Sequence, residues 1–265
     1  MSAAALPSRS ERGRAPLSFA QRSIWRAEEV VPGSALHNET AAFRLAGPVD
    51  ADALERALAA LAPRHEAMRC AIVADADGRP WQHFADRVQH TVERTDLTHL
   101  PAEEREERLA ELVRQAAALP LDLARPPLMR TCLYRLGEDR HLLLFVAHHI
   151  VVDAWAFGTF LEGLAAQYAA ETGGPAVEEP APGPDFGDYA AWQRGDPAAG
   201  RGLDHWRERL DGELPALHLP ADGHGGPRSA DGIAGRSTTS SSPPTSSPGS
   251  ARWPAPGSPP CPPRC

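Results

Sequence analysis

Two adjacent histidines, His148 and His149, are followed by an aspartate, Asp153, four residues after the second. They come after an apolar run at 142–146 and before a long apolar-rich stretch that starts at Ala154. A histidine at the end of a buried strand suits proton transfer near neutral pH, because the ordinary pKa of imidazole is about 6.5. Asp153 can orient a ring, pair with an arginine, or act only as the N-cap of the next helix. The alternative for the histidines is a hydrogen-bonded, structural role in the turn.

A metal site at this pair is disfavoured by its position in the chain. Neighbouring residues of a strand point to opposite faces, so His148 and His149 do not readily serve one ion together. No third ligand at a metal-ligand spacing accompanies them. The chain has four cysteines, Cys70, Cys132, Cys261 and Cys265. Their spacing matches neither a metal site nor a disulfide framework. We therefore expect no metal in this chain.

Apolar periodicity and capping residues predict alternating helices and strands around these residues. Ser18 and Asp50 are predicted N-caps, the first of a helix with Ile24 and Trp25, the second of a helix whose leucines share one face. The other predicted helices span 101–118, 154–170, 186–194 and 203–210, and the predicted strands span 40–45, 68–74, 80–84, 128–136 and 140–147. The run at 142–146 predicts a central strand covered on both faces. This is an α/β pattern, with the histidines at the end of its buried strand.

Composition excludes several classes of function. The formal charge is −8, and the 27 basic residues, all arginine, form no stripe, which argues against nucleic acid as a partner. No apolar run approaches the roughly 18 residues that cross a bilayer, so we expect no membrane contact. Residues 1–16 are polar and contain no apolar core of a secretion signal, so we predict a disordered leader there and a cytoplasmic protein.

Several motifs occur in an order that is typical of one family. The segment at 148–154, HHIVVDA, resembles the HHxxxDG signature of condensation domains of nonribosomal peptide synthetases, which belong to the chloramphenicol-acetyltransferase-like acyltransferases. Further segments resemble other motifs of that family: LSFAQRSIW at 17–25, GPVD at 47–50 with LERAL at 54–58, RHEAMR at 64–69, DYAAWQ at 188–193, and WRERL at 206–210 with LPAD at 219–222. An ordered set is far more specific than any single motif.

The resemblance implies a fold and a division of the chain. We expect an α/β, chloramphenicol-acetyltransferase-like sandwich subdomain, with a mixed sheet and flanking helices. It would occupy residues 17–180 as the N-terminal condensation subdomain, and 181–222 would start the crossover to a second subdomain. Between 240 and 265, nine of 26 residues are proline and seven are serine. Such a composition cannot bury enough apolar surface to offset chain entropy, so 223–265 is predicted to be a disordered, low-complexity tail.

The resemblance also implies an activity and partners. In the family, an amine on one carrier protein attacks a thioester on another and forms an amide bond. Both acyl groups are tethered to phosphopantetheine arms of the peptidyl or aminoacyl carrier proteins, so this chain would bind no cofactor of its own. Its partners would be these carriers and neighbouring synthetase modules. Alternatives are an inactive fragment, a module that binds a carrier without turnover, or a stand-alone acyltransferase that esterifies an alcohol.

Roles for individual residues follow from the resemblance. His149 would be the catalytic residue, as a general base or as a group that positions the amine, and His148 would shape the turn. Asp153 would form a buried ion pair with Arg64, whose rupture would cost about 3–5 kcal/mol. Ala154 stands where the family has glycine, and its methyl group would crowd the turn or the substrate. Three further motif residues are expected to support the structure rather than bind substrate: Gln21, Trp25 and Trp192.

One departure from the family pattern concerns the second half of the domain. The later family motifs, which build the opposite wall and the lid of the substrate tunnel, have no counterpart after Asp222. The change in composition near that point is typical of a truncated gene or an altered reading frame. Catalysis that positions two tethered substrates needs both walls. We therefore expect little or no condensation activity from this chain alone.

Overall fold

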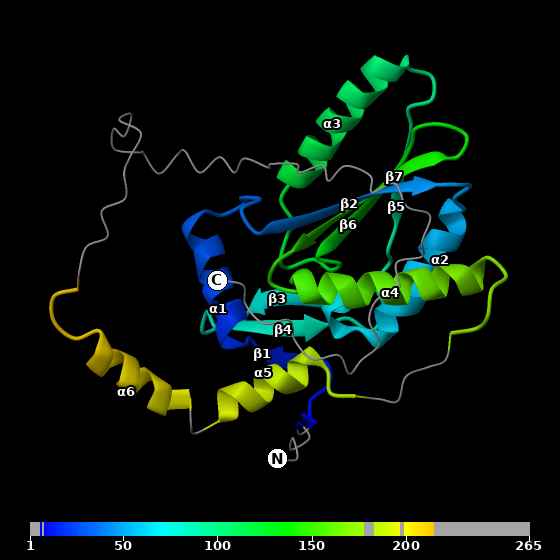
Figure 1. Ribbon diagram of the computed structural model, residues 1–265. Coiled ribbons are helices and arrows are strands. Elements are labelled where there is room, and N and C mark those ends of the chain that lie inside the picture. The colour runs from blue at the N-terminus through cyan, green and yellow to red at the C-terminus, as the bar shows by residue number, and fades with distance from the viewer. Residues whose placement is uncertain (1–5, 7, 178–182, 197–198, 215–265) are drawn as a thin grey trace, which may run out of the picture. The chain divides into compact units, whose positions relative to one another are not determined.

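The run at 142–146 lies in one of the two inner strands of a four-stranded sheet in the computed structural model of the chain (Figure 1). The structure describes residues 6, 8–177, 183–196 and 199–214. The strands are β1 (Arg14–Pro16), β2 (Asn38–Ala46), β3 (Cys70–Ala74), β4 (Pro80–Phe84), β5 (Val92–Asp96), β6 (Met129–Arg135) and β7 (Arg140–His148). The helices are α1 (Phe19–Val30), α2 (Ala51–Leu61), α3 (Ala102–Ala118), α4 (Ala154–Glu171), α5 (Phe186–Gly195) and α6 (Ala199–Arg209), with short turns η1 (Ala62–Arg64) and η2 (Glu66–Arg69).

The larger sheet has the strand order β2-β7-β6-β5. Strand β7 is antiparallel to both of its neighbours, whereas β5 and β6 are parallel, so the sheet is mixed as expected. Every residue of β7 after Arg140 is buried, which confirms the central strand predicted from its continuous apolar run. Strand β5 was not predicted, because its polar sequence VERTD and its place at the sheet edge leave little apolar pattern to detect.

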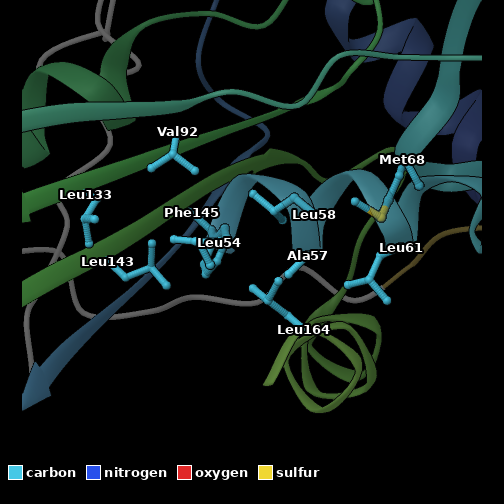
Figure 2. Packing of buried hydrophobic residues seen from close by; sticks show 11 residues of the cluster. Leu54, Ala57, Leu58, Leu61, Met68, Val92, Leu133, Leu143, Phe145 and Leu164 are labelled. Atoms are coloured by element: carbon cyan, nitrogen blue, oxygen red, sulfur yellow. The ribbon is translucent and has the colours of Figure 1, made fainter. Parts of the chain in front are cut away.

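Helices cover both faces of this sheet. Leu143 and Phe145 of β7 pack against α2 and α4, while Leu144 and Val146 pack on the opposite face in a cluster that includes Leu109 of α3. Figure 2 shows Leu54 of α2 beside Phe145 of β7, and Leu61 of α2 directed toward α4, which carries Leu164. The strand alternation thus gives each face of the sheet its own core.

The predicted N-caps are confirmed. The Ser18 hydroxyl accepts a hydrogen bond from the backbone N–H of Gln21 at 3.2 Å, and the Asp50 carboxylate accepts from Asp52 and Ala53. These three bonds satisfy backbone donors that the first turn of a helix leaves free. These caps fix where α1 and α2 begin, and α1 then approaches the end of β7 that carries the histidines.

The N-terminal segment corrects one prediction. Strand β1 pairs antiparallel with β4, with Ala15 opposite Gln82, and forms the edge of the smaller sheet β1-β4-β3. Ala15 is buried, and the side chain of Arg9 is 5% exposed beside Glu66 and Asp188. The prediction of a disordered leader over 1–16 is therefore wrong for 8–16. A three-residue strand is too short to show periodicity, and its partner lies some 70 residues further along the chain. The predicted tail at 223–265 lies outside the described residues.

Within the described part of the chain, no helix has both the length and the apolar character that a bilayer crossing requires.

Candidate active site at the end of strand β7

The turn between β7 and α4 is held by backbone hydrogen bonds from two directions. The N–H of His148 donates to the carbonyl of Leu128 at 2.9 Å, and the N–H of His149 donates to the carbonyl of His37 at 2.8 Å. Within the turn, the N–H of Val151 donates to the carbonyl of His148 at 3.0 Å. Because the backbone is fixed on both sides, the two histidine rings have defined and opposite environments.

The ring of His149 is 41% exposed and has a defined tautomer. Its Nδ1 lies 2.8 Å from the carbonyl oxygen of Val152, which can only accept a hydrogen bond. Nδ1 therefore carries the ring proton, and Nε2 keeps its lone pair. A carboxylate oxygen of Glu39 lies 3.8 Å from the same Nδ1. The ring can accept a proton at Nε2 while its other nitrogen holds it in place.

His148 lies inside the fold, with a side chain that is 2% exposed. Its Nδ1 accepts a hydrogen bond from the backbone N–H of Ile150 at 3.2 Å, so its proton is on Nε2, which lies 3.6 Å from a carboxylate oxygen of Glu28. Burial lowers the pKa of His148, because the charged imidazolium is poorly solvated there. His148 is thus a neutral, hydrogen-bonded residue of the turn.

Gln21 ties α1 to this turn. Its side-chain nitrogen donates to the carbonyl of Ile150 at 3.0 Å and to the side-chain oxygen of Gln82 at 2.9 Å. Its side-chain oxygen accepts from the backbone N–H of Ser18 at 3.0 Å. All three partners are buried, so these polar groups have no access to water and depend on one another. Trp25, also on α1, is half-buried against the cluster that contains Ile150.

Asp153 is exposed and caps α4, which corrects the prediction of a buried ion pair. Its carboxylate accepts a hydrogen bond from the backbone N–H of Ala156 at 2.7 Å. The predicted pair with Arg64 was to be buried, whereas Asp153 lies at the surface; Arg64 ends η1 and is half-buried. The N-cap is available within the same turn, and it satisfies a free N–H of α4 without burying a charge.

The remaining predicted residues lie at the surface. Ala154 is the first residue of α4 and is exposed, so its methyl group does not crowd the turn. Trp192 of α5 is partly exposed and its ring lies 6.0 Å from that of Tyr189. Trp155, which sequence reasoning did not select, is 86% exposed beside the histidine turn. Helix α4 is rich in apolar residues, yet Leu164 is the one residue of this fully described helix that is buried.

Carboxylates of two of the motifs belong to a buried ion network. The guanidinium of Arg9 pairs with the carboxylates of Glu66, in the RHEAMR segment, and of Asp188, in the DYAAWQ segment. Burial opposes ionisation of Asp188, but hydrogen bonds from the N–H groups of Arg9 and Asp185 and the nearby charges of Arg12 and Arg9 outweigh it and lower its pKa. The motif carboxylates therefore anchor the N-terminal segment and α5, a role that no local pattern indicated.

The structure also brings together a set of ligand types that the sequence did not suggest. One donor atom each of Glu28, His37 and His148 lies within 4.8 Å of the other two. Glu28 belongs to the last turns of α1, and His37 precedes β2, whose first residue, Asn38, is opposite His148 in the sheet register. The pairing of β2 with β7 brings His37 close to His148, and the placement of α1 brings Glu28 to both. No spacing in the sequence could have predicted this.

Comparison with known proteins gives a consistent result. A family model described as "Condensation domain" matches residues 11–242. One of the subunits of the linear gramicidin synthase of Brevibacillus parabrevis is 39% identical over 217 residues, which are 80% of this chain and 4% of that protein. Phosphinothricin tripeptide synthetase PhsC of Streptomyces viridochromogenes is 39% identical over 223 residues, which are 82% of this chain and 20% of that protein.

A solved structure of the first condensation domain of the calcium-dependent antibiotic synthetase, in complex with a substrate analogue, has a similar fold. The TM-score is 0.65 at 28% identity, over 74% of this chain and 47% of that chain. The chain thus spans about half the length of this solved domain and a small part of the synthetases.

Proposed function

Because the chain belongs to the condensation domain family of nonribosomal peptide synthetases, we propose that it supplies the histidine-bearing half of an amide-forming site. The donor would be an acyl or aminoacyl thioester and the acceptor an aminoacyl amine, each tethered to the phosphopantetheine arm of a carrier protein. The synthetases among its relatives support this assignment of substrates and partners. The observation that carries the proposal is the exposed His149 ring, whose Nδ1 is bonded to Val152 and whose Nε2 is left to accept a proton.

The proposed reaction follows from that tautomer. The acceptor amine attacks the thioester carbonyl, the C–N bond forms, and the tetrahedral species carries a proton that the nitrogen must lose. Nε2 of His149 takes this proton, the C–S bond breaks, and the imidazolium returns the proton to the leaving thiolate. The bond from Nδ1 to the Val152 carbonyl holds the ring throughout, and the Glu39 carboxylate stabilises the transient positive charge. No covalent bond to the protein is needed, since the donor arrives as an activated thioester.

We further propose that the opposite wall of the site comes from the half of the domain that this chain does not match. Trp155, which is 86% exposed beside the turn, supports this, because tryptophan is enriched among the residues that interfaces cover. The match to 47% of the solved domain agrees with it. With one wall, the two thioester arms would not be held in line for attack. The chain alone would then bind a carrier without forming product.

Amide formation from two loaded carriers tests the proposal. The chain would be assayed by mass spectrometry alone and after fusion to the second half of the PhsC condensation domain. We expect product only from the fusion, with a rate about 10²- to 10⁴-fold lower for His149→Ala, the usual contribution of a general base. His83→Ala, which removes an exposed histidine of β4, is the matched control and should keep the full rate.

Two results would contradict the proposal. An equal rate for the fused wild type and its His149→Ala variant would remove His149 from the chemistry. Product from the unfused chain, well above that of its own His149→Ala variant, would show that one half suffices. Capture of a loaded carrier by the unfused chain, without product, would support a binding half that needs its second wall.

A further inference from the structure

We infer that Glu28, His37 and His148 form a binding site for a divalent transition-metal ion of the zinc type. The inference concerns a site behind the His149 turn and goes beyond the proposed condensation function, which does not require it. The ligand atoms are the carboxylate Oε1 of Glu28, Nδ1 of His37 and Nε2 of His148. Imidazole and carboxylate together are a donor set that zinc accepts, and sites with two histidines and one glutamate keep a fourth position for water.

The separations of the ligand atoms fit such an ion. Oε1 of Glu28 lies 2.5 Å from Nδ1 of His37 and 3.6 Å from Nε2 of His148, and all three atoms lie within 4.8 Å of one another. Ligands about 2.0–2.1 Å from a tetrahedral ion are about 3.3–3.5 Å apart. The two shorter separations fall on either side of that value, so small rotations of the side chains are enough to place an ion between them.

The three ligands are mounted on a fixed frame. Glu28 lies on α1, which Gln21 ties to the turn, and His148 is the last residue of the central strand. The carbonyl of His37 accepts the N–H of His149 at 2.8 Å, so its backbone is fixed to the same turn. The side chains are 13%, 18% and 2% exposed for Glu28, His37 and His148. Little side-chain freedom would therefore be lost when an ion binds.

Zn²⁺ binding would displace the protons on the two ring nitrogens that face the Glu28 carboxylate. Oε1 of Glu28 faces Nδ1 of His37 and Nε2 of His148, and both ring nitrogens must give up their protons to bind a metal. In His148 the proton would move to Nδ1, which now accepts from the N–H of Ile150 at 3.2 Å. That bond must break on binding. The amide of Ile150 is thus a direct reporter of the site, next to the turn that carries His149.

Zinc titration of the full chain tests the inference. Isothermal titration calorimetry at neutral pH, after removal of metals with a chelator, should give one saturable Zn²⁺ per chain. His37→Ala and Glu28→Gln should each weaken binding by at least the roughly 10- to 100-fold that loss of even an outer-shell partner costs. His83→Ala is the matched control, because it removes an exposed histidine outside the site. In ¹H–¹⁵N spectra, the Ile150 amide signal should shift with zinc in the wild type and stay in place in His37→Ala.

Two results would overturn the inference. One is that the wild-type chain shows no saturable Zn²⁺ binding. The other is that Zn²⁺ affinity is unchanged in both His37→Ala and Glu28→Gln while circular dichroism shows that both variants are folded. Since cysteine thiolates also bind zinc, a Cys261→Ser/Cys265→Ser variant is included. Loss of binding in that variant alone would place the ion on those cysteines and refute the site. None of these results depends on condensation activity, so they leave the proposed function to its own test.

Discussion

Replacing Arg9 by alanine would leave the buried carboxylate of Glu66 without its cationic partner. Arg9 and Glu66 are each 5% exposed, and Asp188 is fully buried. Asp188 would keep the N–H groups of residues 9 and 185 and the guanidinium of Arg12, but Glu66 would lose its ion pair. A single buried charge without a partner is among the most destabilising changes that a fold can undergo.

The size of the effect follows from the loss of one partner of a buried ion pair. Burial already raises the pKa of Glu66 above its ordinary value of 4.5, so the charged carboxylate depends on the guanidinium of Arg9. Removing one partner of such a pair leaves an uncompensated buried charge and is strongly destabilising. Loss of the guanidinium over the Phe84 ring, at 5.0 Å, adds up to about 1 kcal/mol. We therefore expect Arg9→Ala to lower the free energy of unfolding by about 3–5 kcal/mol.

Urea unfolding followed by circular dichroism measures this, and pH gives a second, sharper test. A carboxyl group whose folded pKa is raised stabilises the fold below its unfolded pKa and loses that contribution as pH rises. Loss of Arg9 should raise the pKa of the buried Glu66 carboxyl further, so the cost of Arg9→Ala should be smaller at pH 5 than at pH 7. Arg12→Ala, which removes a 56% exposed guanidinium, is the control and should cost less than about 1 kcal/mol. If Arg9→Ala cost no more than Arg12→Ala, or the same at both pH values, the network would not be the buried charge cluster described above.

Three further predictions concern the turn and the core. Asp153→Ala should lower the free energy of unfolding by about 1 kcal/mol, as loss of an N-cap does, and Asp153→Ser should restore most of it. A loss of about 3–5 kcal/mol in urea unfolding would instead favour a buried ion pair. Gln21→Ala should lower the free energy of unfolding by about 1–3 kcal/mol in the same assay, because it leaves the buried Ile150 carbonyl without its hydrogen-bond donor. Gln89 is exposed, so Gln89→Ala should leave the free energy of unfolding unchanged. Burial lowers the pKa of His90, so below about pH 6.5 the unfolded chain binds a proton there that the folded chain does not, and the free energy of unfolding should fall as the pH drops. His90→Gln should flatten this slope between about pH 7 and 5.5. An unchanged slope would contradict a buried, neutral His90.

Local features of the chain were readable from the sequence because they depend on neighbouring residues. The caps at Ser18 and Asp50 need only a side-chain oxygen within three residues of a free N–H. The apolar run before His148 needs only its composition to indicate a strand buried on both faces. The alternation of strand residues also predicted that His148 and His149 would face opposite environments, which the structure gives as one buried ring and one exposed ring.

Features that join distant segments were decided only by the tertiary structure. Strand β1 exists because it pairs with β4, and the side chain of Arg9 is buried because Glu66 and Asp188 come from two other segments to meet it. Asp153 caps α4 at the surface and is not buried, which depends on where the turn lies in the fold. His37 lies near His148 because β2 pairs with β7, and Glu28 lies near both because α1 packs at that end of β7. A sequence states which groups are present and how they alternate, but the register between strands far apart in the chain is set by how all the elements pack together.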